Sequence, residues 1–448
     1  MRIFSPGRLL WSSSLLAIAS AFPDAGDFHS GRLAHGSLHK RCPFGHGQPM
    51  VETEHDKRFL FDTMNSPIDI TGEHEFRPPN FENGDQRGPC PGLNALANHG
   101  YISRNAPWLI VIKFANVIEA INEVYGMGVD LATVLAIMGT VWTGDPLSLD
   151  PSFSIGGRDT NVNSLLGNLG GLLGEPQGLI GSHNFIEADS SNTRDDLYVT
   201  GNNYALNMDK FMTWYNMSSD GTFDMDLMAK RAKLRFQETI RTNPNFYYGP
   251  VTGLIARNAG YIFPGRLFRN HSQENPEGVL TKSHIRNFFG IYGEERNLTY
   301  REGWERIPEN WYKTPVDYGL IQLNLDTIDW MAKYPELGSV GGNTGTVNSF
   351  AGVDLADLTG GVFNLANLLE GNNLLCFVFE ILKFASPDAL DGLYSTLAEP
   401  LEWITNTLPV PLLNMTCPAF EDIQMGGKPF WEAIQNDFPG ALKSGRAF

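Results

Sequence analysis

Cysteine and basic residues are scarce in this chain. Only 4 of its 448 residues are cysteine, and 33 lysines and arginines face 50 aspartates and glutamates. The low cysteine count excludes a small scaffold held by disulfides, and a chain of this length can bury a core without them. The formal net charge of −17 argues against a nucleic-acid partner, because phosphate binding requires a basic surface. We expect one large domain or two ordinary ones.

Long apolar runs are also scarce. The first 21 residues combine Arg2 and Arg8 with an apolar stretch at 9–18 and the small residues Ala19-Ser20-Ala21. This pattern is typical of a signal peptide, here cleaved after Ala21. The stretch is too short to span a membrane, and we expect no membrane span in the rest of the chain. The sequence therefore predicts a secreted protein that passes through the secretory route.

Asn-x-Ser/Thr sequons support a secretory route. None has proline at its middle position, and with a signal peptide ahead of them they predict glycosylation. The four asparagines are Asn216, Asn270, Asn297 and Asn414.

Alternating strand patterns are rare and no internal repeat is visible, whereas apolar residues recur at helical spacing. Residues 22–85 are rich in Pro, Gly, His and charge and predict an irregular N-terminal arm. The fold class predicted for the rest is mostly α. The apolar helix faces are Phe114, Val117, Ile118, Ile121, Val124 and Tyr125; Leu131, Val134, Leu135 and Met138; Met225, Met228, Ala229, Ala232, Phe236 and Ile240; and a stripe within 390–404.

One cysteine has a distinctive setting, in the stretch GPCPGLNALANHGY at 88–101. Pro91 suits the first position of a helix, which makes Cys90 the N-cap beside free backbone N–H groups. Such a setting is expected to lower the pKa of a thiol, and a thiolate can ligate haem iron. The spacing alone leaves two interpretations open, a functional thiolate and an inert cysteine at a helix start.

The same stretch resembles the proximal motif of the fungal haem-thiolate peroxidases, the chloroperoxidase and unspecific peroxygenase family. The resemblance implies that Cys90 is the proximal ligand of haem b. It also implies that residues 86–448 form a single haem-enclosing helical domain of the chloroperoxidase type, in an oxidoreductase that acts with hydrogen peroxide on a small organic substrate.

A second stretch, HNFIEADSSNTR at 183–194, resembles the cation motif of that family. The resemblance implies that the Glu187 side chain, the Ala188 carbonyl and the Ser191 hydroxyl hold Mg²⁺ or Mn²⁺ beside a haem propionate. Hard oxygen ligands suit Mg²⁺. Ala188 stands where glycine or histidine is usual, but a backbone carbonyl survives that change.

Near the C-terminus, Cys376 and Cys417 are placed like the C-terminal disulfide of the longer peroxygenases. The resemblance implies that they pair and that Cys42 is left free on the arm.

The family's distal acid–base residue has no evident counterpart. In the longer peroxygenases this glutamate lies a few residues before a Phe-Pro pair, and counting back from Phe263-Pro264 reaches Ala259 or Gly260. No acid occurs from 243 to 264, and Arg257 is the single charged residue there. The group is therefore unknown, with Glu175 and Asp189 as alternative sources.

Three hypotheses follow from this gap. The first is a peroxidase or peroxygenase whose acid–base group is relocated or weak. The second is a haem protein of secondary metabolism that performs non-peroxide chemistry. The third is a degenerate secreted homologue that serves in binding or at the cell surface.

Overall fold

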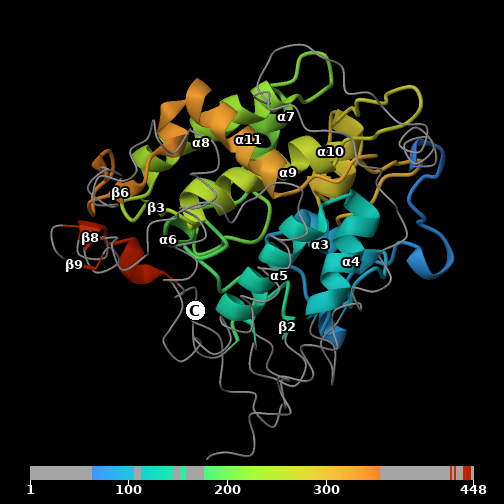
Figure 1. Ribbon diagram of the computed structural model, residues 1–448, viewed down its shortest axis with the longest axis horizontal. Coiled ribbons are helices and arrows are strands. Elements are labelled where there is room, and N and C mark those ends of the chain that lie inside the picture. Colours follow the sequence, from blue (N-terminus) through green and yellow to red (C-terminus); the bar gives the residue numbers. More distant parts are fainter. Residues whose placement is uncertain are drawn as a thin grey trace, which may run out of the picture.

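The computed structural model describes residues 63–104, 112–144, 152–157, 176–353, 424–425, 428–429 and 437–444. Helices dominate them (Figure 1), which confirms the predicted mostly α class. No helix in this part of the chain is long and apolar enough to cross a membrane. Several predictions lie outside the described residues: the signal peptide, the 390–404 helix, Cys42, Glu175, Cys376, Asn414 and Cys417.

Three of the predicted helices form one group (Figure 1): α3 (Pro91–Asn98), α4 (Phe114–Tyr125) and α5 (Val129–Thr143). Helices α4 and α5 pack together, and most of the predicted apolar residues whose side chains the structure describes are buried, while Ile118 and Leu135 are half-buried. Gly126 makes the turn between them with φ of +67°, and a Cβ there would lie 2.6 Å from Thr314. Glycine is required at this position, which explains why the helical pattern breaks there.

A second group consists of α8 (Met225–Thr242), α9 (Asn258–Leu267) and α11 (Leu320–Lys333). Helix α9 packs against both α8 and α11. Asp224 is the N-cap of α8, and its carboxylate accepts a hydrogen bond from the Leu227 N–H at 2.7 Å. The helix ends before Asn243-Pro244, as the sequence predicts. A short π-helix, η4 (Thr252–Arg257), leads directly into α9.

The other elements are short. The strands form small antiparallel sheets, and the largest has the order β3-β6-β7. The remaining helices are η2 (Gly72–His74), η3 (Phe81–Asn83), α6 (Leu197–Thr200), α7 (Met208–Tyr215), α10 (Lys282–Phe288), η5 (Pro335–Gly338) and η8 (Ala441–Lys443). The strands are β1 (Ile112–Lys113), β2 (Ser152–Phe153), β3 (Tyr247–Tyr248), β4 (Ile291–Tyr292), β5 (Thr299–Tyr300), β6 (Gly341–Asn343), β7 (Phe350–Gly352), β8 (Gln424–Met425) and β9 (Lys428–Pro429).

A buried aromatic cluster fixes the start of α3. Phe268 and Phe288 stack with ring centroids 4.0 Å apart, and Tyr125 lies against both rings and against Trp311. The Tyr125 hydroxyl donates to the Gly92 carbonyl at 2.8 Å. Because Gly92 is in the first turn of α3, this cluster positions the end of the helix that carries Cys90.

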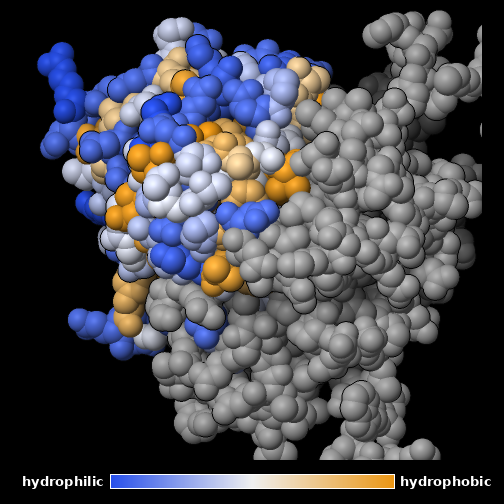
Figure 2. All heavy atoms as spheres, turned by 90° about the vertical axis from the view of Figure 1, so that its left-hand side faces the viewer, coloured by the Kyte–Doolittle hydropathy of each residue, from blue (hydrophilic) through white to orange (hydrophobic). Residues whose placement is uncertain are grey.

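The surface is polar where Figure 2 shows it. Among the described residues on that face, hydrophilic side chains dominate and apolar ones form small separate patches.

The end of α3 is attached to the segment that precedes it (blue in Figure 1). The His99 ring faces the His74 carbonyl with Nδ1 at 2.7 Å, while its Nε2 accepts from the Ile307 N–H at 3.2 Å. These partners require a neutral ring with the proton on Nδ1. Burial lowers the pKa of His99 to about 4.

We expect His99 to contribute to acid denaturation. Its pKa in the folded state lies below the unfolded value of about 6.5, so the unfolded chain binds the proton first. Stability present at neutral pH is then lost as the pH falls from about 6.5 toward 4. Between pH 7 and pH 4.5, the free energy of unfolding measured with urea should fall by about 2 kcal/mol more in the wild type than in His99→Gln. An equal loss in both proteins would contradict this role.

Candidate active site

Cys90 is the N-cap of α3, with Pro91 at the first helical position, as the sequence predicts. It is a free cysteine, and the residue as a whole is partly exposed. Burial raises the pKa of Cys90, and the backbone N–H groups of Leu93 and Gly92 lower it; burial outweighs them. The predicted lowering of the Cys90 pKa was wrong, because the desolvation of the thiol comes from tertiary packing. A coordinated metal ion would still deprotonate the thiol.

The two sequence motifs meet beside Cys90. Arg194, the last residue of the second motif, lowers the pKa of the Cys90 thiol, and Glu305 raises it. Arg194 Nη2 lies 3.7 Å from Glu305 Oε1, and both side chains are buried. The sequence motif assigns Arg194 no role and does not include Glu305.

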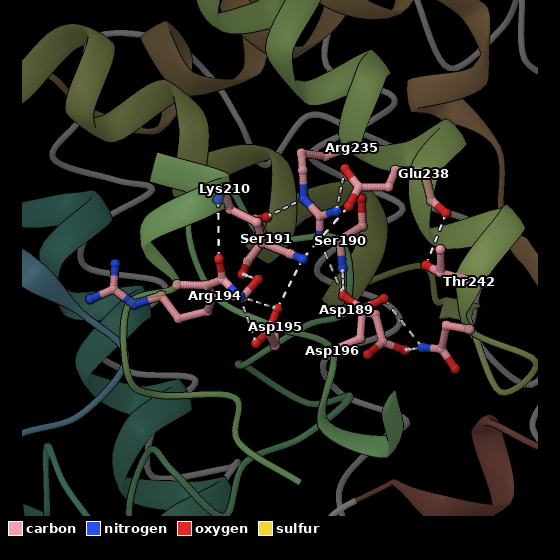
Figure 3. A network of polar contacts seen from close by, with 12 residues as sticks. Asp189, Ser190, Ser191, Arg194, Asp195, Asp196, Lys210, Arg235, Glu238 and Thr242 are labelled. Atoms are coloured by element: carbon pink, nitrogen blue, oxygen red, sulfur yellow. Dashed lines mark hydrogen bonds and ion pairs between the residues drawn. The ribbon is translucent and has the colours of Figure 1, made fainter. Parts of the chain in front are cut away.

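The second motif runs as a buried loop whose backbone carbonyls accept hydrogen bonds from arginine side chains. Figure 3 shows Arg235 extending from α8 toward Ser191 and Asp196. An unpaired buried carbonyl costs about as much free energy as a lost hydrogen bond, so these contacts fix the path of the loop. The pairs are Arg257 Nε to Ser190 O at 3.2 Å, Arg235 Nε to Ser191 O at 2.9 Å and Arg231 Nη2 to Asn192 O at 2.8 Å.

Ser190 has a left-handed backbone, with φ of 65°. Such a conformation is uncommon outside glycine and persists only where the surroundings determine it. Arg257 Nη2 donates to Ser190 Oγ at 2.8 Å, the Tyr261 hydroxyl donates to its carbonyl at 2.8 Å, and its N–H donates to Asp196 Oδ1 at 2.8 Å. Arg257 therefore has a structural role.

Glu187 is buried, and one of its two carboxylate oxygens, Oε2, contacts other side chains. His183 Nδ1 and Asn203 Nδ2 each lie 2.7 Å from Oε2. Within the part of the chain that the structure describes, Oε1 has no hydrogen-bond partner. Among the hydrogen bonds of the described residues, none ends on the Ala188 carbonyl, and the Ser191 hydroxyl makes a long contact of 3.5 Å to the Arg194 carbonyl. The three predicted oxygen ligands are thus largely free of other partners.

Asp189 lies in a buried group with His183 and Asp196. Burial and Asp196 raise the pKa of Asp189, while His183 lowers it. Burial lowers the pKa of His183, but Glu187 and Asp189 raise it more. The Asp189 carboxylate accepts from Asn243 Nδ2 at 2.9 Å and is fully enclosed. No group of three or more His, Cys, Asp or Glu among the described residues is arranged to hold a metal ion.

The two positions predicted for the distal acid lie in α9 but differ in surroundings. Ala259 is 3% exposed. Gly260 is exposed, and a Cβ built there meets no atom within 4 Å. Only Gly260 offers room for a longer side chain.

The sequons also differ. Asn216 and Asn297 are exposed. Asn270 is half-buried, and its carbonyl oxygen accepts from the Tyr312 N–H at 2.8 Å. Glycosylation stays a prediction at each of them.

Known proteins share the sequence over most of its length. Residues 74–316 match the family model "Peroxidase, family 2". The aromatic peroxidase fscJ of Fusarium equiseti is 59% identical over 392 residues, 87% of this chain and 89% of that protein. The dothistromin biosynthesis peroxidase dotB of Dothistroma septosporum is 40% identical over 366 residues, 81% and 85% of the two chains.

An aromatic peroxygenase of Coprinellus radians is 31% identical over 181 residues, 39% of this chain and 62% of that protein. These matches confirm the predicted family and the prediction of an enzyme. The chain belongs to the fungal haem-thiolate peroxidases and is a haem-thiolate peroxidase.

Proposed function

We propose that this protein uses hydrogen peroxide to oxidise a small organic substrate, with haem b bound through Cys90. The observation that carries the proposal is the position of Cys90 at the start of α3, partly exposed and facing the Gly92 and Leu93 amides. A bound haem b would supply peroxide activation, which thiolate donation to the iron favours.

The residues around Cys90 fit this role. The aromatic cluster and the hydrogen bond from Tyr125 to Gly92 hold the first turn of α3. The N-cap position orients the sulfur, and the helix dipole stabilises its negative charge. Arg194 adds a cation nearby. The chain thus holds the Cys90 sulfur at a fixed position, where a coordinated iron would deprotonate it.

A divalent cation, most simply Mg²⁺, fits the second motif. Glu187 Oε1 is buried without a partner, and the Ala188 carbonyl and Ser191 hydroxyl complete a set of hard oxygens that Mg²⁺ accepts. His183 and Asn203 orient the carboxylate by holding its other oxygen.

We propose that this protein lacks the usual distal acid–base group. Gly260 occupies the place of the family's glutamate, and Arg257 and Asp189 are committed to structural contacts. Proton transfer to and from the peroxide oxygens is then slow, because acid–base help is typically worth about 10²–10⁴ in rate.

The relatives suggest the substrate class and the setting. One is named for aromatic peroxidation and one for the biosynthesis of dothistromin. We propose an aromatic intermediate of a secondary metabolite as substrate. We also propose secretion, with glycans on the exposed Asn216 and Asn297.

Non-peroxide chemistry is the second candidate, favoured by the absence of acids from 243 to 264. Substrate turnover without H₂O₂ would support it, and turnover that requires H₂O₂ would exclude it.

Cys90→Ala should abolish the thiolate-type spectrum, because it removes the sulfur ligand. The measurement is the strongly red-shifted Soret band of the reduced carbon monoxide complex. Cys42→Ala is the matched control and should keep this band. Loss of the band in the control alone would refute the assignment.

Glu187→Gln should remove the stoichiometric metal and weaken haem retention, because a neutral amide binds Mg²⁺ poorly. Metal analysis of the haem-loaded wild type and variant provides the measurement. Glu336→Gln, a partly exposed site on η5, should retain both. A wild type without Mg²⁺ or Mn²⁺ would rule out the site.

Gly260→Glu should raise peroxide-dependent oxidation of a generic dye at least about tenfold by restoring a carboxylate. Ala259→Glu is the contrasting variant, since it would place a charge in a buried position and should lower stability instead. Brisk oxidation by the wild type, unchanged in Gly260→Glu, would show that another group already transfers the proton.

A further inference from the structure

Glu305 is fixed to the helix that Cys90 begins. The Asn98 side-chain amide donates to the Glu305 carbonyl at 2.7 Å and to the Gly303 carbonyl at 2.6 Å. Arg87 in turn donates to Asn98 Oδ1 from Nε at 2.9 Å and from Nη2 at 2.6 Å. The loop that carries Glu305 therefore cannot move independently of α3.

The Glu305 side chain is completely buried and poorly satisfied. Within the described part of the chain, neither of its carboxylate oxygens makes a well-formed hydrogen bond, and Arg194 Nη2 also lacks one. The two groups lie 3.7 Å apart. Replacing a buried ion pair by apolar residues is often neutral or stabilising, so stability alone does not explain this pair.

The buried pair lies near the Cys90 end of α3. The Asn94 side chain interacts with Glu305. It also bonds the Gly88 backbone, two residues before Cys90, at 3.0 and 2.9 Å. Arg194 lowers the pKa of the thiol and Glu305 raises it. Asn94 connects Cys90 to Glu305. Its N–H donates to the Cys90 carbonyl at 3.1 Å, and its side chain lowers the pKa of Glu305. Burial raises the pKa of Glu305, and Arg194 opposes this shift.

We propose that Glu305 and Arg194 are positioning residues whose balanced charges set how strongly the Cys90 thiolate donates electrons to the iron. This proposal rests on the haem-thiolate function proposed above. Arg194 alone would draw electron density away from the sulfur, and Glu305 offsets that cation. In a buried site such charges interact strongly, because little water screens them.

The test is the ferric–ferrous reduction potential of the haem-loaded full chain. Glu305→Gln keeps the size of the side chain and removes its charge, so the potential should shift in the positive direction. The Soret band of the reduced carbon monoxide complex should move to shorter wavelength. The double variant Arg194→Gln with Glu305→Gln removes both charges and should return toward the wild-type potential, which a merely structural role would not produce.

Glu302→Gln is the matched control, because Glu302 is exposed in the same loop. Its potential should equal that of the wild type. If Glu305→Gln behaves like this control, the proposal is wrong while the haem-thiolate function stands. A wild type without the thiolate spectrum would instead refute the function.

If Glu305→Gln does not retain haem, the haem content of the double variant Arg194→Gln with Glu305→Gln provides the test. The double variant should then load haem, because it leaves no unbalanced charge beside the sulfur. Failure of both variants to load haem would assign Glu305 a structural role and overturn the proposal.

Discussion

The loop at 187–194 turns inside the protein, and its shape depends on arginine side chains that satisfy its carbonyls. Buried carbonyls without partners would cost more than this loop can recover from its few apolar contacts. Arg231 and Arg235 come from α8 and Arg257 comes from the end of η4. The positions of α8 and α9 are therefore coupled to the motif, and the packing of these two helices is a condition for the site.

This arrangement gives the acidic residues near the motif different roles. Asp196 supports the Ser190 N–H and pairs with Arg235 at 3.5 Å. Glu187 is held from one side by His183 and leaves one oxygen unpartnered. Among the described residues of the motif, Glu187 Oε1 and Asp189 Oδ1 both lack a hydrogen-bond partner. Asp189 Oδ1 faces His183 Nε2 at 3.9 Å, so Glu187 Oε1 is the oxygen that we assign to a cation. Geometry, rather than the number of acids, decides which of them can bind a metal.

Local patterns were sufficient for much of the fold. The N-cap position of Cys90 follows from Pro91, and Asn243-Pro244 marks the end of α8, because both effects operate within one helical turn. Arg231 and Arg235 lie at i and i+4 on the same face as Met228 and could have been recognised as buried.

Glu305 could not have been recognised in this way. The Asn98 side chain, 207 residues away, holds its backbone carbonyl, and no local pattern encodes such a contact. The pKa of Cys90 is a similar case, because the desolvation that raises it comes from tertiary packing.

The same reasoning limits where a distal acid–base group can come from. Such a group must reach the peroxide oxygens and needs a pKa near the working pH. Asp189 fails the first condition, because its carboxylate is enclosed and bound by Asn243. Arg257 is committed elsewhere, because its N–H groups donate to Ser190 and to the Ala232 carbonyl. Within the η4–α9 segment, the remaining candidate is the exposed position of Gly260. There the protein has space but no proton donor.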